Sequence, residues 1–357
     1  MPHLAAWERA GEVPRALHRS AAAAGLLGAG VPEEVGGSGG DLVDLTVATE
    51  ALIEHGASSG LMAALFTHGI ALPHIIAAGD PAQIERFVRP TLAGERIAAL
   101  AVTEPEAGSD VARLRTSAVR HGDHYVVNGV KLYITSGVRA DFVTTAVRTG
   151  GPGHAGISLL VIERGTAGFT VGAALTKMGW RCSDTAELLF SDCVVPAANL
   201  VGREHAGFGL LAQQFVGERL SLATHAHAMA QRCLDLTAVH TRLRTTFGAP
   251  LASRQVVAHR LVAMHQRVAL ARTYTRSIVV RAAAGESPVA EACMAKNAAV
   301  EACGWVVDQA VQLHGGAGYL EGTEVERHYR DARILGIGGG ATEVLTDLAA
   351  RLLGYRA

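Results

Sequence analysis

The sequence has almost no excess of charge and no long hydrophobic run. Among its 357 residues, 32 Lys and Arg balance 33 Asp and Glu, and the formal net charge is -1. Such a balance argues against a nucleic-acid-binding surface. No run approaches the roughly 18 apolar residues of a membrane-spanning helix, and Glu8 and Glu12 stand where a secretory leader would be basic and then apolar. We therefore expect a cytoplasmic protein without nucleic-acid or membrane partners.

The cysteines suggest neither a disulfide framework nor a zinc site. They are odd in number and scattered, and no two form a Cys-x-x-Cys pair: Cys182, Cys193, Cys233, Cys293 and Cys303. A reducing compartment fits this pattern best. His225 and His227 lie two residues apart on a predicted helix and point in different directions, so they do not chelate one metal. We expect no bound metal.

Two common nucleotide-binding motifs are also missing. No Gly-x-Gly-x-x-Gly follows a predicted strand and opens a helix, and no Gly-x-x-x-x-Gly-Lys-Ser/Thr is present. The dinucleotide-binding and P-loop interpretations therefore lack their structural context. If the protein binds a cofactor of this kind, it does so by another route.

The hydrophobic pattern divides the chain into three parts, as its length allows. Residues 1–98 are alanine-rich with apolar residues at helical spacing, interrupted by a glycine-rich loop at residues 30–40. Residues 99–203 have short β-branched runs between turns, and residues 204–357 return to long helical periodicity. The pattern predicts an α+β multidomain fold, with an N-terminal helical domain, a central antiparallel β-domain and a C-terminal helical bundle.

The central part contains several strand signals. Asn128-Gly129 separates two β-branched runs and predicts a hairpin turn between strands at residues 125–127 and 130–134. Few helical patterns intervene, so the sheet is expected to be mostly antiparallel. Further strands are expected at residues 142–147, 157–162 and 187–195.

Two stretches of the central part offer groups for a ligand. Thr103 and Ser109 place hydroxyls in a strand-to-loop turn with free backbone amides, which suits a flavin edge or phosphate oxygens. The alternative is a structural turn in which Asp110 caps a short helix. Strand alternation places Tyr133 and Thr135 on one face, where a ring and a hydroxyl can share one ligand. An aromatic residue on a strand can equally belong to the core.

Five segments occur in one order along the chain, at residues 101–110, 128–137, 217–220, 244–255 and 312–344. Each is a weak signal alone. Together they resemble the acyl-CoA dehydrogenase family over nearly the whole chain. The resemblance implies an N-terminal helical domain, a central β-domain and a C-terminal four-helix bundle. It also implies FAD as the cofactor and an acyl thioester as the substrate.

The resemblance assigns the FAD contacts to particular residues. Tyr133 stands where the family usually has tryptophan. The segments around Arg244 and Gln312 match those that reach the FAD of a neighbouring subunit, which implies a homodimer or homotetramer. Arg244 could instead cap a helix end, and Thr342 and Glu343 could simply begin a helix. The assigned residues are Thr103, Ser109, Tyr133, Thr135, Arg244, Phe247, Gln255, Gln312, Gly315, Gly316, Thr342 and Glu343.

The usual catalytic base of the family is missing. Where most members have a loop glutamate after an Arg-Asp-Ala-Arg segment, this chain has Gly339. A minority of members, including isovaleryl-CoA and long-chain acyl-CoA dehydrogenases, place the glutamate on a helix in a Glu-Arg-Leu sequence. Glu218-Arg219-Leu220 matches that sequence, so we expect Glu218 to be the base, with a solvated helix residue as the alternative. The Gly339 N–H would polarise the thioester carbonyl.

The resemblance extends to the substrate and the reaction. Ser109, Arg219, Gly339 and Gly340 are expected to contact the substrate, although Arg219 could instead form a surface salt bridge. The expected reaction is α,β-dehydrogenation of an acyl-CoA to the trans-2-enoyl thioester, with an electron-transfer flavoprotein as the acceptor. The alternatives are a flavin oxidase or monooxygenase of the same fold and a catalytically silent acyl-thioester binder. A carrier protein in place of coenzyme A stays open, as does the acyl chain.

Overall fold

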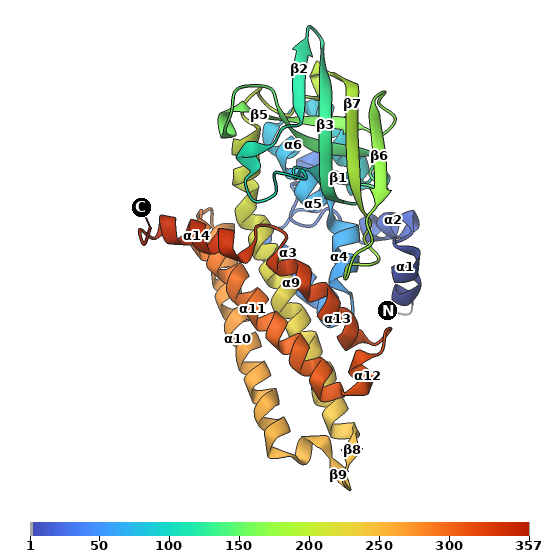
Figure 1. Cartoon of the computed structure of the whole chain (residues 1–357), viewed down its shortest axis with the longest axis vertical. Helices are drawn as coiled ribbons and strands as arrows, with labels where there is room; N and C mark the ends of the chain where they lie inside the picture. The colour runs from blue at the N-terminus through green and yellow to red at the C-terminus, as the bar shows by residue number, and fades with distance from the viewer. Residues whose placement is uncertain (1–2, 357) are drawn as a thin grey trace.

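The computed structural model describes residues 3–356 and contains the three expected parts (Figure 1). The first part is helical, and the predicted loop at residues 30–40 contains no α-helix. In the described chain no single helix is long and apolar enough to cross a bilayer, although the bent pair Ser59–Phe66 and His68–Ala78 passes that test together. The helices are α1 (Leu4–Ala10), α2 (Arg15–Ala23), α3 (Leu42–Glu54), α4 (Ser59–Phe66), α5 (His68–Ala71), α6 (Pro73–Ala78), α7 (Pro81–Gln83) and α8 (Arg89–Leu92).

The second part is a seven-stranded sheet with the order β1-β4-β2-β3-β7-β6, in which β5 pairs with β4. Most pairs are antiparallel, as expected, but β1 and β4 are parallel, as are β2 and β4 where they meet at Ser117 and Arg148. The strands predicted at residues 142–147, 157–162 and 187–195 are present with slightly wider bounds. The strands are β1 (Ala98–Ala101), β2 (Ser117–His121), β3 (His124–Thr135), β4 (Phe142–Arg148), β5 (Ile157–Glu163), β6 (Phe169–Ala174) and β7 (Thr185–Pro196).

The hairpin predicted at Asn128-Gly129 is wrong. Strand β3 runs through both residues, and its turn to β2 lies between His121 and His124. Gly129 sits at a register shift in the β3–β7 pair, and a Cβ atom on it would lie 2.5 Å from Oγ1 of Thr116. A close approach within the sheet therefore explains the glycine, not a turn.

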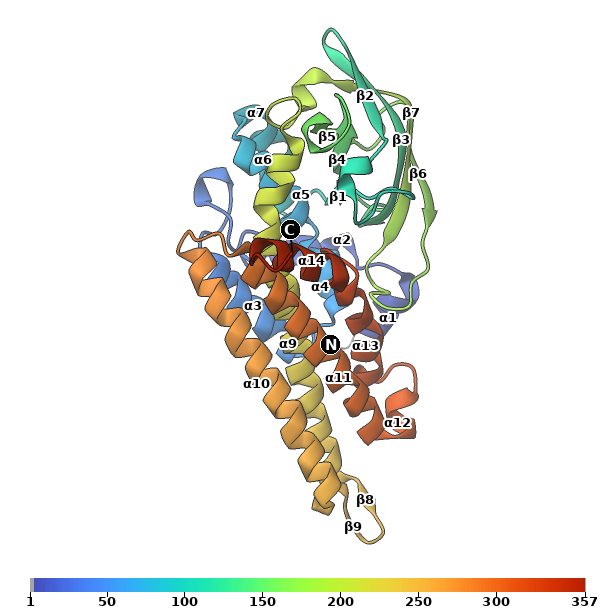
Figure 2. The same ribbon diagram turned by 60° about the vertical axis from the view of Figure 1, so that its left-hand side comes forward.

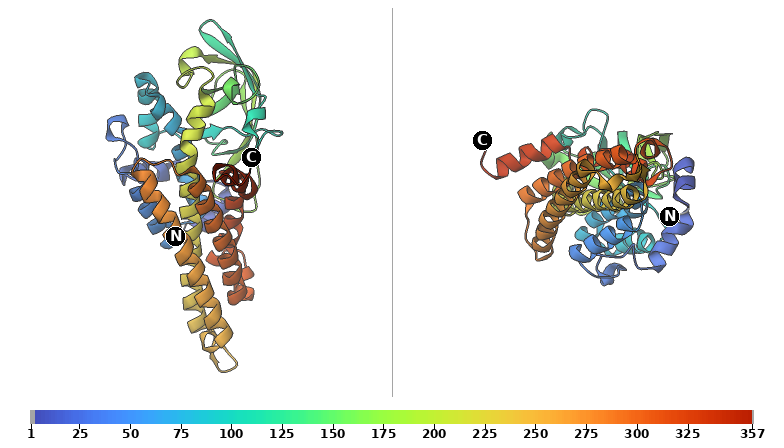
Figure 3. Two further views of the ribbon diagram at one scale, coloured as in Figure 1. Left: turned by 90° about the vertical axis from the view of Figure 1, so that its left-hand side faces the viewer. Right: turned by 90° about the horizontal axis from the view of Figure 1, so that it is seen from below.

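The third part is a bundle of three long helices with shorter helices packed against them (Figure 2). Helices α13 and α14 pack on α11, while α3 of the N-terminal part packs on α9 and α10. The small hairpin of β8 (Thr245–Thr246) and β9 (Ala249–Pro250) joins α9 to α10 at the end of the molecule opposite the large sheet (Figures 1 and 3). The helices are α9 (Gly207–Leu243), α10 (Gln255–Ala283), α11 (Val289–His314), α12 (Gly316–Tyr319), α13 (Glu324–Ala332) and α14 (Thr342–Leu352).

One buried carboxylate joins all three parts. Asp331 on α13 accepts the backbone N–H of Gly60 on α4 at 3.2 Å and that of Trp180, in the loop before β7, at 2.6 Å. The side chain of Asp331 is fully buried, and burial raises its pKa. A Cβ atom on Gly60 would lie 2.8 Å from Cα of Trp180. The N-terminal helix, the sheet and the bundle therefore meet at this residue.

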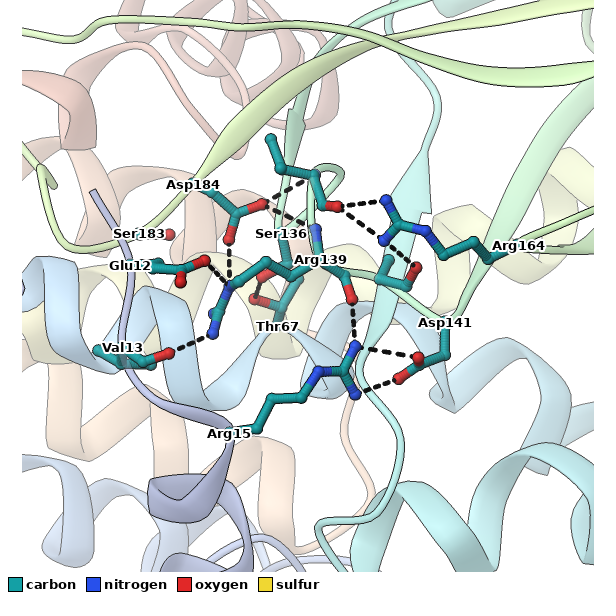
Figure 4. A network of polar contacts seen from close by, with 12 residues as sticks. Glu12, Val13, Arg15, Thr67, Ser136, Arg139, Asp141, Arg164, Ser183 and Asp184 are labelled. Carbon is teal, nitrogen blue, oxygen red and sulfur yellow. Dashed lines mark hydrogen bonds and ion pairs between the residues drawn. The ribbon is translucent and has the colours of Figure 1, made fainter. Parts of the chain in front are cut away.

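A second polar network fastens the N-terminal helices to the sheet (Figure 4). Arg139 donates from Nε to Oδ1 of Asp184 at 2.7 Å and from its guanidinium to the carbonyl oxygen of Val13 at 2.5 Å. Arg15 on α2 pairs with Asp141 at 2.9 Å. Because these contacts join residues far apart in the sequence, they fix the first two helices against the loop before β4.

Candidate active site

Glu218 lies on α9 close to the loop that contains Gly339. Its side chain is partly buried, and burial raises the pKa of its carboxyl above the ordinary value, although the charges of Lys296 and Arg219 act in the opposite direction. In residues 3–356 no protein group donates a hydrogen bond to this carboxylate. A carboxylate with a raised pKa and free oxygens is suited to accept a proton.

Gly339 has a left-handed conformation, with φ of +64°. A Cβ atom on it would lie 3.3 Å from Oε1 of Glu218 and 2.3 Å from Cδ1 of Leu222. The structure therefore brings together the two positions that the sequence singled out, the helix glutamate and the glycine of the loop. Leu222, one helical turn after Glu218, fills the space that a side chain at position 339 would need.

The backbone N–H of Gly339 is a free donor. Within the described chain it makes no hydrogen bond to any backbone or side-chain acceptor. The carbonyl oxygens on either side of it are occupied, because Lys296 Nζ donates to Gly338 at 2.5 Å and to Gly340 at 2.6 Å. A free N–H beside a carboxylate is the arrangement needed to hold a carbonyl oxygen while a neighbouring proton is removed.

Arg219 is inside the protein and not on its surface. It is 7% exposed, and its guanidinium carbon lies 5.1 Å from the centre of the Phe215 ring. In the described chain it forms no ion pair, and its Nε has no hydrogen-bond partner. The alternative of a surface salt bridge is therefore wrong. The buried cation acts on Glu218 by charge, and its expected contact with the substrate stays a prediction.

The turn at Thr103 reshapes the end of strand β3. Thr103 accepts the N–H of Leu132 at 2.9 Å, and its hydroxyl donates to the Leu132 carbonyl at 2.5 Å. Next to this contact the β3–β7 register shifts, and Tyr133 adopts a left-handed φ of 63°. A bulge interrupts the regular strand here, yet the burial pattern agrees with the prediction that Tyr133 and Thr135 lie on one face. Buried Ile134 lies between these two residues, and Tyr133 is 67% exposed.

A buried ion pair supports this turn from behind. Lys131 is fully buried and donates to Oε1 of Glu104 at 2.8 Å and to the Val102 carbonyl at 2.9 Å. Glu104 also accepts the backbone N–H groups of Arg115 and Thr116. Thr103 therefore stands between two residues that are fixed by a satisfied buried network.

Ser109 lies at the exposed end of the same turn. The next residue, Asp110, is one of those that line an open groove of about 610 Å³. The side chain of Asp110 caps nothing, so the alternative of a simple helix cap is wrong. Arg148 shapes the groove by donating to the carbonyl oxygens of Ala112 at 2.7 Å and Gly151 at 2.6 Å. Arg113 and Arg115 also line it, so its arginines outnumber the one lining carboxylate, Asp110, although Arg115 is paired with Glu106 at 2.7 Å.

Thr342 and Glu343 begin α14 immediately after the glycine loop. Thr342 is partly buried, and its carbonyl accepts an N–H of Asn297 at 3.0 Å. Gly340 has φ of +98° and lies against Leu345. These residues are near Glu218 in the chain fold, so the structure gathers Glu218, Gly339, Gly340 and the start of α14 at one place.

The other predicted residues lie elsewhere in the chain. Glu218 and Leu243 are 25 residues apart on α9, or roughly 38 Å along the helix axis. Arg244 therefore lies near the far end of the bundle. The stacked rings of His240 and His314, 4.2 Å apart, bring the ends of α9 and α11 together. That end carries Arg244, Phe247, Gln255, Gln312, Gly315 and Gly316.

The exposure of this far cluster is unusual. Phe247 is 99% exposed with φ of 50°, and the exposed Tyr319 follows the glycines. Cβ atoms on Gly315 and Gly316 would meet nothing within 4 Å. Packing within one chain does not explain an exposed phenylalanine and two open glycines, whereas an outside ligand or a second chain does.

These features fit a flavin dinucleotide. The outward ring of Tyr133 beside Thr103 and Thr135 offers an aromatic face with adjacent polar groups, as an isoalloxazine requires. The open glycines and Arg244 at the far cluster offer backbone approach and a planar cation for phosphates. The two sets lie at opposite ends of the molecule, since Tyr133 belongs to the large sheet and the far cluster to the end of the bundle opposite that sheet.

Two residues of the site were missed from the sequence. Lys296 is a buried lysine within an alanine-rich helix, and Leu222 is one of many apolar residues on α9. Helical periodicity offers a signal for Lys296, since Ala292, Ala299 and Cys303 on the same face are buried. Nothing in the sequence marks Leu222, because its role depends on a loop more than 100 residues away.

Comparison with known families covers almost the whole chain. Residues 1–95 match the acyl-CoA dehydrogenase N-terminal domain, residues 99–193 the middle domain and residues 205–354 the C-terminal domain. Long-chain specific acyl-CoA dehydrogenase of Rattus norvegicus mitochondria is 38% identical over 98% of this chain and 82% of that protein.

Solved structures agree with this match. A protein of Mycobacterium smegmatis assigned as an acyl-CoA dehydrogenase is 60% identical, with a TM-score of 0.99 over 100% of this chain and 94% of that one. The acyl-CoA dehydrogenase of Geobacillus kaustophilus is 39% identical, with a TM-score of 0.94 over 99% of this chain and 93% of that one.

Proposed function

The chain belongs to the acyl-CoA dehydrogenase family, whose members are FAD-dependent enzymes that dehydrogenate acyl-CoA, and we propose that Glu218 is the catalytic base in this member. The observation that carries the proposal is the contact between the two candidate positions. A Cβ atom on Gly339 would lie 3.3 Å from Oε1 of Glu218, so the helix carboxylate lies next to the position from which a loop carboxylate would extend.

In the proposed reaction the carboxylate of Glu218 takes a proton from the α carbon of the acyl thioester. The electron pair of that C–H bond forms the α,β double bond as a hydride leaves the β carbon. FAD, when bound, supplies the acceptor for this hydride. The product is the trans-2-enoyl thioester. Protonated Glu218 then returns its proton to solvent before the next turnover.

The neighbourhood of Glu218 supports this role. Burial raises the pKa of its carboxyl, which makes the ionised form a better acceptor for a weakly acidic proton. The free N–H of Gly339 is proposed to hold the thioester carbonyl and stabilise the negative charge that develops as the proton leaves. Ser109 and the groove lined by arginines are proposed to receive the phosphate-bearing end of coenzyme A.

We also propose that the complete site needs two chains. One chain would supply Glu218, Gly339 and the turn at Thr103, and the far cluster with Arg244 and Gln312 would come from its partner. The separation of roughly 38 Å along α9 and the full exposure of Phe247 support this division. An electron-transfer flavoprotein is proposed as the acceptor, by analogy with the family.

The test is Glu218→Gln, with Glu301→Gln on the exposed face of α11 as the control. Removal of a general base is expected to lower the rate of flavin bleaching by acyl-CoA by about 10²- to 10⁴-fold, with FAD content and acyl-CoA binding retained. Bleaching at the wild-type rate would overturn the assignment. Anaerobic reduction of the wild-type protein followed by fast reoxidation in air would favour an oxidase, and binding without bleaching a silent thioester-binding protein.

A further inference from the structure

Lys296 is a buried cation without a carboxylate partner. It is 1% exposed, and within the described chain it forms no ion pair. Burial lowers its pKa to about 8, against the opposing charge of Glu218. Arg219 and Cys293 are the other ionisable groups that act on it. Burial of a charged lysine costs free energy, so the contacts that Lys296 makes must explain why it is retained.

The two bonds that Lys296 makes are both to the glycine loop. Its Nζ lies 2.5 Å from the carbonyl oxygen of Gly338 and 2.6 Å from that of Gly340. Gly338, Gly339 and Gly340 have no side chains to hold them, and glycine has a wide choice of backbone angles. The ammonium group therefore fixes a segment that its own sequence leaves free.

Because the peptide bond is planar, the bond from Lys296 to the Gly338 carbonyl also sets the direction of the Gly339 N–H. The described chain has no cis peptide, so the carbonyl of Gly338 and the N–H of Gly339 point in opposite directions within one plane. The carbonyl is turned inward onto Lys296. The N–H is consequently turned away from Lys296, and it has no acceptor in the described chain.

We propose that Lys296 is a positioning residue that aims the N–H of Gly339 at the thioester carbonyl of the substrate. A hydrogen bond from an ammonium group also polarises the peptide that accepts it, so the N–H on the far side becomes a better donor. The bond to Gly338 acts on the peptide that contains the N–H of Gly339, and the bond to Gly340 holds the peptide between Gly340 and Ala341. This inference rests on the proposed role of Glu218 and Gly339 in removal of the α-proton.

The adjacent residue offers a matched control. Asn297, next on α11, donates to the Thr342 carbonyl and to Thr346 Oγ1, each at 3.0 Å, and so ties α11 to α14 without touching the carbonyls of the glycine loop. Lys296→Met keeps the side-chain volume and removes the donors. Replacement of a buried charge by an apolar residue of similar shape is often neutral for folding. Asn297→Ala removes an anchor between the same two helices.

The experiment uses the FAD-loaded enzyme and an acyl-CoA whose β carbon is replaced by sulfur, which can lose its α-proton but not a hydride. Exchange of the α-proton in D₂O, followed by mass spectrometry, measures proton removal alone. Lys296→Met is expected to slow exchange by about 10²- to 10³-fold, the usual effect of losing one such donor. Asn297→Ala is expected to stay within about threefold of wild type, the margin that we set for an effect unlike donor loss.

A binding measurement separates aiming from general damage. An S-alkyl-CoA, a thioether without the carbonyl, is expected to bind Lys296→Met as tightly as wild type, while the thioester binds more weakly. Three results would overturn the role of Lys296. The first is that Lys296→Met binds both ligands more weakly by the same factor. The others are that Lys296→Met exchanges the α-proton at the wild-type rate, or that Asn297→Ala slows exchange as much as Lys296→Met does. Glu218→Gln is measured in parallel. If it exchanges at the wild-type rate, the assignment of the base fails; if it alone is slow, only the role of Lys296 fails.

Discussion

The side chain of Glu218 lies within contact distance of the position that a Cβ atom on Gly339 would occupy. A Cβ atom at position 339 would stand 3.3 Å from Oε1 of Glu218, although the two residues belong to a helix and a loop more than 100 positions apart. The same Cβ would overlap Leu222, at 2.3 Å from its Cδ1. Only one of the two positions can therefore hold the carboxylate in this chain.

The overlap predicts that moving the base to the loop fails. In the double variant Glu218→Gly, Gly339→Glu, the new side chain meets Leu222 and a backbone φ of +64°, a conformation that disfavours non-glycine residues by about 1–2 kcal/mol. We expect no recovery of acyl-CoA oxidation above the level of Glu218→Gly alone. Addition of Leu222→Ala is expected to give partial recovery, by removing the overlap. Recovery in the double variant with Leu222 intact would contradict this account.

Burial of Glu218 predicts a variant that is less active and more stable. Its pKa is raised in the folded state, so the unfolded chain ionises first as the pH rises. The contribution of Glu218 to the free energy of unfolding therefore falls between the unfolded pKa and the folded one, and then levels off. The Glu218→Gln variant does not lose this stability, because glutamine does not ionise. We expect its melting temperature to exceed that of wild type by an amount that is small at acid pH and grows through this window.

The measurement is thermal unfolding of both proteins without substrate over a series of pH values, at matched FAD content. Only the difference between the two proteins is compared, since all other groups titrate alike in both. A difference that does not depend on pH, or one that shrinks as the pH rises, would contradict the raised pKa of Glu218.

The buried pair Lys131–Glu104 predicts unequal effects of single and double substitutions. Lys131→Met leaves Glu104 buried without its cation, and loss of one partner of a buried pair typically costs about 3–5 kcal/mol. We expect a lower midpoint of urea unfolding and loss of FAD, because the turn at Thr103 rests on this pair. The double variant Lys131→Met, Glu104→Gln should recover much of the stability. Equal stability of the single and double variants would show that the pair is not coupled.

The division of the site between two chains predicts complementation. Glu218→Gln removes the base, and Arg244→Ala removes a residue of the far cluster, so each protein alone should be nearly inactive. After the two are mixed, unfolded and refolded together, mixed dimers contain one site with both residues intact. We expect activity to return to a fraction of wild type, at most about a quarter for random pairing with one intact site in each mixed dimer. No recovery despite proven mixed dimers would argue for sites made within one chain.

The sequence predicted the order of the three parts because long helical periodicity and β-branched runs are local signals. It also brought Glu218 and Gly339 into one hypothesis, through paired motifs and without geometry. It failed at Asn128-Gly129, where the glycine is needed because Thr116, the residue before β2, packs closely against it, and not because the chain turns there. The bulge at Tyr133 was also not predicted, since it lies next to hydrogen bonds between Leu132 and Thr103, a residue 29 positions earlier than Leu132.

Lys296 shows most clearly what could not be predicted from the sequence. A lysine in a helix is usually solvated, and only the packing of α11 against the glycine loop makes this one an anchor. Helical periodicity places Lys296 on the buried face of α11, but it does not identify the backbone atoms that the side chain contacts. Contacts between a side chain and a distant backbone carbonyl leave no pattern in the sequence of either segment.

The junction at Asp331 has a consequence for how this chain can diverge. Both of its partners are backbone N–H groups, at Gly60 and Trp180, and a backbone donor survives most exchanges of its side chain. The carboxylate has no such freedom, and position 60 is held to glycine by the 2.8 Å approach to Trp180. Mutations can therefore accumulate around the contact between the three parts while positions 60 and 331 stay fixed. A change in any one of the three parts is therefore tolerated only if it leaves the carboxylate of Asp331 and the close approach at Gly60 in place.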